Sequence, residues 1–573
     1  MANLLLSAIG AYAKYAKASF IRKTLQPIET QEKYLRKLLG VQQNTELGRS
    51  FGLKDIKTID QFRQQVPIWS YSDYEPYTQR VAQGEPNVLN PDPVVYINLT
   101  SGTTGKQKMV PVTWRFHHSL SNANAPSFGF LLDALKMHSV RRSQPLEFGR
   151  ILSTNVARIQ GYTSGGIEYG PVTVGSLRRS RSLGQCGFAQ PFEVLEIADS
   201  VSRHYVALLF GLCNPNVRSM MANFPMLLLQ TCKYLEKYAE DLIWDIEQGT
   251  IANWLPLEPE IRTKLERQWV ASPGRAAELR EIVRSQGRLT PKLAWSKLSL
   301  LATARGGTSD FYFERFPEYF GDTPSFGGVF GTAEGTFGIY YDLNQDGSIL
   351  ALESSFYEFV PRDQWDVEQP KTVLPTEVKV GEYYRILVTN YSGFYRYDIG
   401  DVVEVVGFYE QTPIIVFRHR RGGLLSSTTE KTTEFHVSQA MQMLQQEFNL
   451  MLEDFCITLS ENEFPAHYWV NIELAPGQII NHPEAFLARF DYWLGEFNHP
   501  YATVRSDQVP PPCLRILAPG SFAIVRQRQL LRGTSDSQLK IPHVTENRRF
   551  LDNLQVLQEF RLPADLVGLR VEG

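Results

Sequence analysis

A loop of small hydroxylated residues and glycines follows an apolar run at residues 94–97, and its composition suits phosphate binding. Glycines let successive backbone N–H groups converge on an anion, while hydroxyls and Lys106 supply further donors and positive charge. A nucleotide polyphosphate is therefore expected to contact Thr100, Ser101, Gly102, Thr103, Thr104 and Gly105. The spacing disfavours a P-loop NTPase, because Thr100 replaces the first glycine of that motif and Gln107 its final Ser/Thr. The alternative is an ordinary turn after a strand.

A second candidate is the aromatic and glycine-containing run Phe330, Gly331, Thr332, Ala333 and Glu334. An aromatic ring beside glycine suits contact with an adenine face. Mg²⁺ on a nucleotide is usually held by one or two carboxylates together with phosphate oxygens, so a single glutamate is sufficient. Glu334 is thus the expected metal ligand, and a solvated turn is the alternative.

A third candidate is Asp401, which directly follows Gly400. A carboxylate just after a glycine can accept two hydrogen bonds from ribose hydroxyls, as the acidic residue of dinucleotide-binding folds does. The alternative is an aspartate at a hairpin edge that forms a structural ion pair with Arg396.

Two further segments near the C-terminal part of the chain carry cations. The basic cluster at residues 417–423 contains Phe417 and Arg420 and ends in two glycines. Its guanidinium groups attract phosphate or ribose oxygens, and the glycines can absorb a backbone rotation between domains; a solvated loop is the alternative. Lys540 lies two residues before Pro542, which favours an extended, accessible backbone from which an ammonium group can reach a neighbouring site.

The composition of the 573-residue chain limits the function classes. A net charge of −3 gives no basic footprint for nucleic acid. The five cysteines include no C-x-x-C pair, so a disulfide framework or zinc ribbon is not indicated, and a reducing cytoplasm fits best. The first 20 residues carry Lys14 and Lys17 without a long apolar run, which predicts an amphipathic helix and no stable membrane insertion.

The elements that must position these groups follow from periodicity. Apolar residues recur at helical spacing over residues 29–39 and 225–251, whereas residues 338–341, 356–360 and 384–388 are short β-rich runs. From about residue 425 a helix at 436–448, a strand at 468–472 and a helix at 483–497 indicate a small α+β domain. The expected fold is α/β (mixed α+β), with a large N-terminal domain at 1–422 and a small C-terminal domain at 423–573.

The order and spacing of these motifs resemble the adenylate-forming superfamily, and more closely the acyl-acid amido synthetases of the Gretchen Hagen 3 family. The run at residues 389–397, T-N-Y-S-G-F-Y-R-Y, is the most specific part of the resemblance, followed by the segments at 330–334 and 538–542. Two positions depart from the family pattern. Ala333 replaces a hydroxylated residue, for which Thr332 could substitute, and Asp398 stands where plant members usually carry arginine.

The resemblance implies that ATP and Mg²⁺ are used to adenylate a carboxylic acid, after which an amine, expected to be that of an amino acid, takes the acyl group and AMP leaves. In this reading residues 101–105 hold the β- and γ-phosphates, Glu334 the metal, Asp401 the ribose, Arg420 a ribose or phosphate oxygen, and Lys540 the α-phosphate. The segment 115–210 is expected to contribute to the acyl pocket, and the C-terminal domain to swing between the two steps. The alternatives are transfer to a thiol of coenzyme A or a carrier protein, and a non-catalytic nucleotide-binding homologue.

Overall fold

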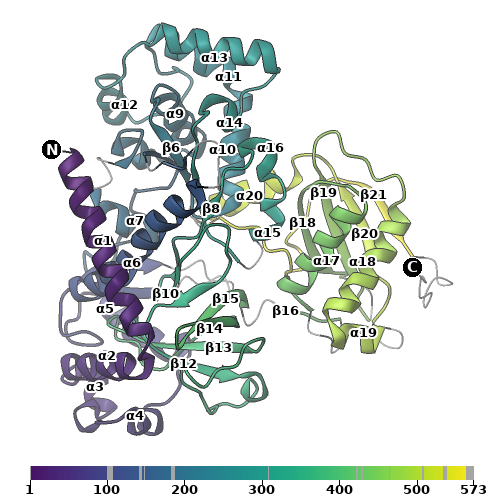
Figure 1. The fold of residues 1–573 in the computed structure, drawn as a ribbon. Helices are drawn as coiled ribbons and strands as arrows, with labels where there is room; N and C mark the ends of the chain where they lie inside the picture. The colour runs from purple at the N-terminus through teal and green to yellow at the C-terminus, as the bar shows by residue number, and fades with distance from the viewer. Residues whose placement is uncertain are drawn as a thin grey trace. The chain divides into compact units, whose positions relative to one another are not determined.

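The chain forms two compact units, Met1–Phe417 and Arg418–Gly573 (Figure 1). The division falls within strand β15, a few residues before the boundary expected from sequence. The structure is a computed structural model that describes residues 2–99, 108–140, 145–147, 149–181, 187–306, 309–420, 424–427, 430, 432–461, 463, 465–505, 509–532, 534 and 539–562.

A seven-stranded sheet in the order β12-β13-β14-β15-β11-β10-β9 forms the centre of the first unit. Its strands are β9 (Val329–Thr332), β10 (Gly335–Tyr340), β11 (Ser348–Leu350), β12 (Phe356–Pro361), β13 (Tyr383–Thr389), β14 (Tyr397–Tyr409) and β15 (Thr412–Arg420). β13 pairs antiparallel with both β12 and β14, and β10 with both β9 and β11. The three β-rich runs expected from sequence are therefore confirmed as β10, β12 and β13.

Two four-stranded sheets complete the first unit, in the orders β2-β1-β5-β4 and β3-β6-β7-β8. The first contains β1 (Val94–Leu99), β2 (Met109–Thr113), β4 (Gly161–Tyr162) and β5 (Glu168–Gly170). The second is parallel throughout and contains β3 (Arg150–Ser153), β6 (Val217–Met221), β7 (Leu300–Ala302) and β8 (Ser325–Phe326). The apolar run before the candidate phosphate loop is thus the buried strand β1.

Helices cover these sheets. In the first unit they are α1 (Ala2–Thr24), α2 (Pro27–Gln42), α3 (Glu46–Ser50), α4 (Ile59–Gln65), α5 (Tyr71–Ala82), α6 (Trp114–Ser139), α7 (Val172–Arg179), α9 (Ser200–Leu212), α10 (Pro225–Lys237), α11 (Ala239–Gln248), α12 (Pro259–Glu266), α13 (Pro273–Gln286), α14 (Pro291–Ala294), α15 (Ser309–Phe313) and α16 (Phe316–Phe320). The expected helix at 225–251 is two helices, because the chain leaves helical geometry at Tyr238. Helices α9 to α14 gather at one end of the unit, and α1 lies along α6 (Figure 1).

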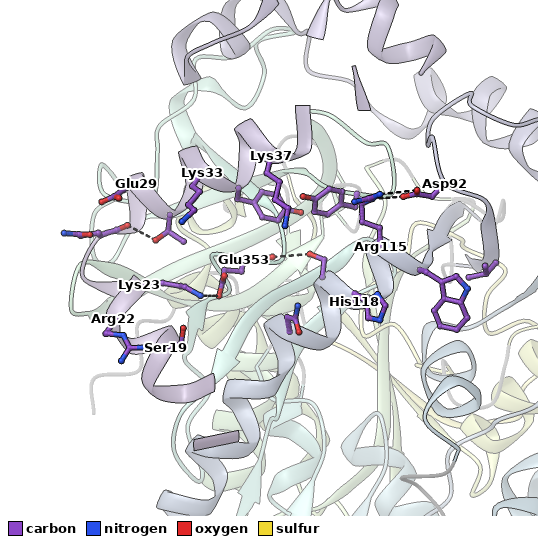
Figure 2. Close-up of a pocket in the computed structure, with 18 of the residues that line it drawn as sticks. Ser19, Arg22, Lys23, Glu29, Lys33, Lys37, Asp92, Arg115, His118 and Glu353 are labelled. Atoms are coloured by element: carbon purple, nitrogen blue, oxygen red, sulfur yellow. Dashed lines mark hydrogen bonds and ion pairs between the residues drawn. The ribbon is translucent and has the colours of Figure 1, made fainter. Parts of the chain in front are cut away.

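Apolar packing joins the N-terminal helices to the seven-stranded sheet. The buried face of α2 presents Leu35, Leu38 and Leu39, at the three- and four-residue spacing of an amphipathic helix. These leucines belong to the same core cluster as Phe356 of β12 and Val388 of β13. Helices α1 and α2 and the start of α6 border a hollow of about 1090 Å³ (Figure 2).

The second unit is a small α+β domain. Its main sheet, β18-β19-β20-β21, consists of β18 (Leu452–Leu459), β19 (Tyr468–Leu474), β20 (Cys513–Leu517) and β21 (Val556–Arg561), and a short ribbon is formed by β16 (Leu424–Leu425) and β17 (Thr432–Thr433). Its helices are α17 (Glu434–Glu447), α18 (Pro483–Phe497), α19 (His499–Arg505) and α20 (Ser521–Leu531). The mixed fold expected from sequence, with a large and a small domain, is confirmed. None of the helices that the structure describes combines the length and apolar character needed to span a bilayer.

Candidate functional site

The turn between β9 and β10 carries Glu334, and side chains from two other segments hold its backbone. Asn98, at the end of β1, donates from Nδ2 to the Ala333 carbonyl at 3.0 Å. Asn390, just after β13, donates from Nδ2 to the Glu334 carbonyl at 2.6 Å. The Glu334 N–H donates to Thr332 Oγ1 at 3.2 Å. The end of the strand that feeds the candidate phosphate loop is thereby tied directly to the glutamate turn.

The carboxylate of Glu334 is buried, at 2% exposure, which excludes the solvated turn considered from sequence. No described residue forms a hydrogen bond to its Oε2 atom. A buried carboxylate oxygen without a partner is costly unless a cation or donor meets it. A hard divalent cation such as Mg²⁺ prefers this kind of oxygen ligand, so the residue present fits the expected metal.

The surroundings of Ala333 explain why this position lacks the hydroxyl expected from the motif. The Ala333 side chain is buried in the main core cluster of the first unit, where a hydroxyl would need a partner. Thr332 retains a hydroxyl one position earlier, and although its oxygen already accepts from the Glu334 N–H, its O–H remains able to donate.

Phe330 and Phe417 were both expected from sequence to contact a nucleotide, and the structure brings them together. Their rings lie 5.8 Å apart at an angle of 50°. Phe330 also packs edge-on against Phe337 of β10, at 5.4 Å between ring centres. The end of β15 and the strand before the glutamate turn therefore form one half-buried aromatic surface.

Asp401 lies inside β14, the third strand of the seven-stranded sheet, and is 1% exposed. It is therefore not at a sheet edge. Gly400 before it has a φ of +82°, a conformation that glycine adopts without the Cβ clash of other residues. The β13–β14 register shifts between Arg385 and Leu387, opposite this position. The glycine and the irregular pairing set the direction of Asp401 in an otherwise regular strand.

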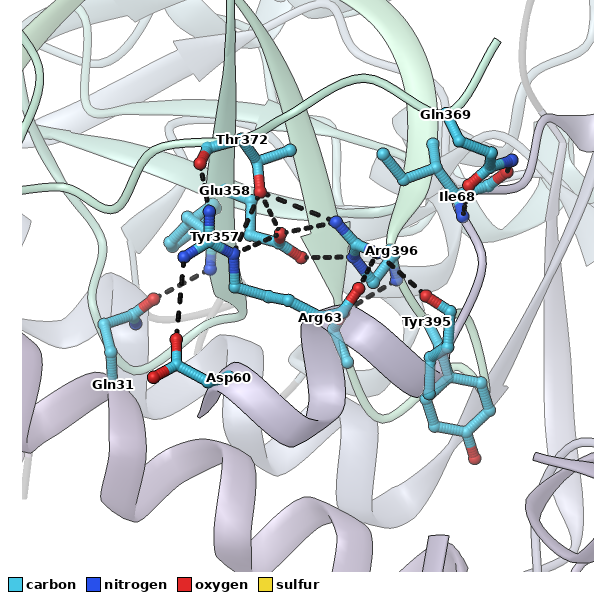
Figure 3. A network of polar contacts seen from close by, with 12 residues as sticks. Gln31, Asp60, Arg63, Ile68, Tyr357, Glu358, Gln369, Thr372, Tyr395 and Arg396 are labelled. Carbon is cyan, nitrogen blue, oxygen red and sulfur yellow. Dashed lines mark hydrogen bonds and ion pairs between the residues drawn. The ribbon is translucent and has the colours of Figure 1, made fainter. Parts of the chain in front are cut away.

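Arg396, the partner considered for Asp401, pairs with Glu358 of β12 (Figure 3). Its Nε and Nη2 atoms donate to the two Glu358 oxygens, each at 2.9 Å, and Nη1 donates to the carbonyls of Arg63 and Val66. Thr372 donates from Oγ1 to Glu358 at 2.5 Å. The pair is buried and joins β12 and the residue just before β14 to the end of α4.

The motif search missed a cation that lies three residues after the candidate phosphate loop. The Lys108 ammonium is 3.4 Å from the Tyr397 hydroxyl and lies over the rings of Tyr71 and Tyr397. Burial raises the pKa of the Tyr71 phenol, and the negative charge of Glu334 adds to the rise. The sequence signal that could have revealed Lys108 is its position two residues after Lys106 of the loop.

Lys540, in the second unit, is held at the start of α17. Its Nζ is 3.2 Å from Glu434 Oε2, and the other oxygen of Glu434 accepts from the His543 N–H at 3.0 Å. Burial opposes ionisation of Glu434, but the charges of Lys540 and His543 prevail and hold its pKa below its ordinary value of 4.5. The lysine side chain is 37% exposed, so it is accessible as well as anchored.

The remaining sequence candidates are placed as follows. The phosphate-loop residues 100–105 lie outside the described residues. Gly331 and Thr332 are in β9, and Arg420 is the last residue of β15, in the second unit.

Three family models match the chain in order: the GH3 family N-terminal domain at residues 16–325, the central domain at 348–420 and the C-terminal domain at 435–549. The indole-3-acetic acid-amido synthetase GH3.10 of Arabidopsis thaliana is 27% identical over 582 residues, covering 94% of this chain and 96% of the relative. The jasmonoyl–L-amino acid synthetase JAR4 of Nicotiana attenuata is 28% identical over 468 residues, covering 78% of each chain.

Solved structures show the same fold. The AtGH3.15 acyl acid amido synthetase in complex with 2,4-DB superposes with a TM-score of 0.84 at 23% identity, covering 96% of this chain and 97% of that one. A 2-hydroxyisobutyryl-CoA ligase in the postadenylation state gives a TM-score of 0.55 at 10% identity, covering 91% and 90%. The resemblance seen in the sequence motifs is thus confirmed along nearly the whole chain, which belongs to the GH3 family.

Proposed function

We propose that this protein is an ATP-dependent acid–amino acid ligase. A carboxylic acid attacks the α-phosphorus of ATP to form an acyl-adenylate and pyrophosphate, and an amine then attacks the acyl carbon and releases AMP. The observation that carries the proposal is the buried, unpartnered Glu334 oxygen on a turn tied to both β1 and the segment after β13.

Residues of both units are proposed to supply the groups that such a reaction needs. The barrier to adenylation is mainly one of charge and positioning, so preformed donors and cations carry the catalysis. In this proposal Phe330 and Phe417 face the adenine, and Asp401 accepts from the ribose. Lys108 adds positive charge at the end of the phosphate loop, whose residues 100–105 bind the phosphates. Arg420 contacts a ribose or phosphate oxygen.

Glu334 would hold Mg²⁺, which when bound neutralises phosphate charge. The chain itself buries the Glu334 carboxylate away from water. It also orients this residue, because Asn98 and Asn390 hold the backbone of the turn. Lys540 stabilises the negative charge that develops on the α-phosphate and carboxylate oxygens. An amino acid is the proposed acceptor, and a small carboxylic acid the acyl donor.

Transfer to an amine is favoured over transfer to a thiol by the family models and by the curated relatives, which are named amido synthetases. The likeness to a CoA ligase at 10% identity concerns the fold alone. A cytoplasmic location is part of the proposal, because the four cysteines described, Cys213, Cys232, Cys456 and Cys513, are free thiols.

Exchange of labelled pyrophosphate into ATP tests the first half-reaction, with Mg²⁺ and a panel of aryl, indole and fatty acids. Exchange that depends on one acid class, and that falls on the order of 100- to 1000-fold in Lys540→Ala, supports the proposal. Arg532→Ala, an exposed cation of the same unit, is the control and keeps the wild-type rate. Exchange that Lys540→Ala leaves intact would overturn the role of the lysine.

The second half-reaction is tested with the acid identified by exchange. Mass spectrometry of products formed with an amino-acid mixture or with coenzyme A distinguishes the acceptors. An amide with stoichiometric AMP supports the ligase, whereas a thioester without amide contradicts it.

A further inference from the structure

The hollow bordered by α1, α2 and the start of α6, hereafter the α1–α2 pocket, is lined by more basic than acidic side chains (Figure 2). Five cationic residues and three carboxylates face it: Arg22, Lys23, Lys33, Lys37 and Arg115 against Glu29, Asp92 and Glu353. Its volume of about 1090 Å³ is slightly above the range for small-molecule sites, roughly 300–1,000 Å³.

Ion pairs neutralise only part of this charge. Lys23 pairs with Glu353 at 2.7 Å, and Arg115 pairs with Asp92 at 2.6 Å. Among the described residues, the three other cations, Arg22, Lys33 and Lys37, form no ion pair. A cluster of unpaired cations around one concave surface produces a local potential that attracts multiply charged anions.

Ordinary helix electrostatics explain Arg22 and, in part, Lys33, but not Lys37. Arg22 lies in the last turn of α1, where a cation stabilises the helix dipole. Lys33 follows Glu29 of α2 by one turn, a favourable spacing, but Lys37 follows Lys33 by one turn, where like charges at i and i+4 destabilise a helix. An anion between them converts this repulsion into attraction.

The rest of the lining gives the pocket firm walls. Gln26, the N-cap residue of α2, lines the pocket and provides no side-chain cap, and Glu29 in the first turn of the helix lines it as well. Tyr34 and Tyr391 pack edge-on with ring centres 5.5 Å apart, and the Tyr34 hydroxyl donates to the Ser354 carbonyl at 2.7 Å. The cations therefore surround a surface whose aromatic side chains are fixed in place.

The α1–α2 pocket is separate from the candidate catalytic site. It is lined by Pro93 and Val95, at the beginning of β1, whereas the candidate phosphate loop follows the end of that strand. Four residues of extended chain, about 13 Å, separate Val95 from Leu99, the last residue of β1.

We propose that the α1–α2 pocket binds a second ligand, a small molecule or head group that carries several phosphate charges, through Arg22, Lys33 and Lys37. Lysine ammonium groups on flexible stems suit phosphate as point charges, and arginine adds directional donors. This site is independent of the adenylation reaction and does not rest on it.

Calorimetric titration of the full-length protein with myo-inositol hexakisphosphate tests the proposal. The protein is first saturated with α,β-methylene-ATP, so that the nucleotide site does not contribute. The wild type binds one hexakisphosphate, and K33E/K37E raises the Kd by about 10- to 100-fold, because two solvent-exposed charge contacts are lost and repulsion is added. If the reversal variant does not fold, K33Q/K37Q replaces it, with a smaller expected rise.

The matched control is K54E/K264E, which changes the net charge equally at two exposed lysines outside the pocket. It keeps the Kd within about threefold of the wild type. Absence of binding to the wild type, or an equal loss in both double variants, overturns the site, because affinity would then reflect net charge alone.

Vesicle sedimentation identifies the source of the phosphates. Phosphatidylcholine vesicles with and without phosphatidylinositol 4,5-bisphosphate are mixed with the wild type and K33E/K37E. Co-sedimentation of the protein with vesicles that requires both the bisphosphate lipid and the two lysines supports a lipid head group as the ligand. Binding of hexakisphosphate without co-sedimentation supports a soluble ligand in the same pocket.

Discussion

At the residue scale, Glu434 joins the proposed catalytic lysine to the backbone that follows it. One oxygen accepts from Lys540 and the other from the His543 N–H, and both contacts lie at the first turn of α17, where a carboxylate also stabilises the helix dipole. Glu434→Gln is expected to lower the free energy of unfolding of the second unit by about 1.5–3 kcal/mol, the range for hydrogen bonds to charged groups.

The effect of Glu434→Gln depends on pH. The pKa of Glu434 is lowered in the folded protein, so its stabilising contribution is fully present above pH 4.5 and is lost as the pH falls through the lowered pKa. Denaturant unfolding of wild type and variant at a series of pH values measures this difference. Glu496→Gln, an exposed position late in α18, is the control. If the difference in the free energy of unfolding between wild type and variant did not change as the pH was lowered, Glu434 would not be ionised in the folded protein.

At the element scale, the buried Arg396–Glu358 pair joins three segments of the first unit (Figure 3). Arg396 has a φ of +43°, which is uncommon for a residue with a side chain, and the contacts of its guanidinium hold it there. Removing one partner leaves a buried charge uncompensated. Glu358→Ala is therefore expected to lower the free energy of unfolding of the first unit by about 3–5 kcal/mol.

Denaturant unfolding followed by tryptophan fluorescence measures the loss. Asp60→Asn is the comparison, since Asp60 is 84% exposed and lies 3.9 Å from Arg63, next to the same network. An exposed pair of this kind contributes less than about 1 kcal/mol. Equal effects of the two substitutions would show that the buried pair is not a major source of stability.

At the scale of the whole molecule, the family resemblance predicts that the unit with Lys540 moves between the two half-reactions. Gly422 and Gly423 follow three arginines, which make this segment a substrate for trypsin. We expect an acyl-adenylate analogue, an acyl sulfamoyladenosine, to change the rate of cleavage after Arg420 or Arg421 by several-fold. Sulfamoyladenosine without the acyl group is the control ligand. Equal cleavage rates for the free protein, the complex with the acyl-adenylate analogue and the complex with the control ligand would count against movement at this segment.

Local patterns in the sequence were sufficient for much of the fold. The helical spacing at residues 29–39 predicted α2, and the short β-rich runs at 356–360 and 384–388 predicted β12 and β13, because each signal lies within one short segment. The break between α10 and α11 was missed, since a continuous apolar periodicity does not show where backbone geometry changes at one residue.

The sequence by itself determined the chemical groups, their order along the chain and the family to which they belong, because motifs are contiguous. Only the tertiary structure decided the environment of those groups. Glu334 is buried with one oxygen unpartnered because Asn98 and Asn390 reach its turn from other parts of the chain. Arg396 meets Glu358, and three unpaired cations meet around the α1–α2 pocket, for the same physical reason: contacts between distant residues arise when elements pack, and no local pattern encodes them.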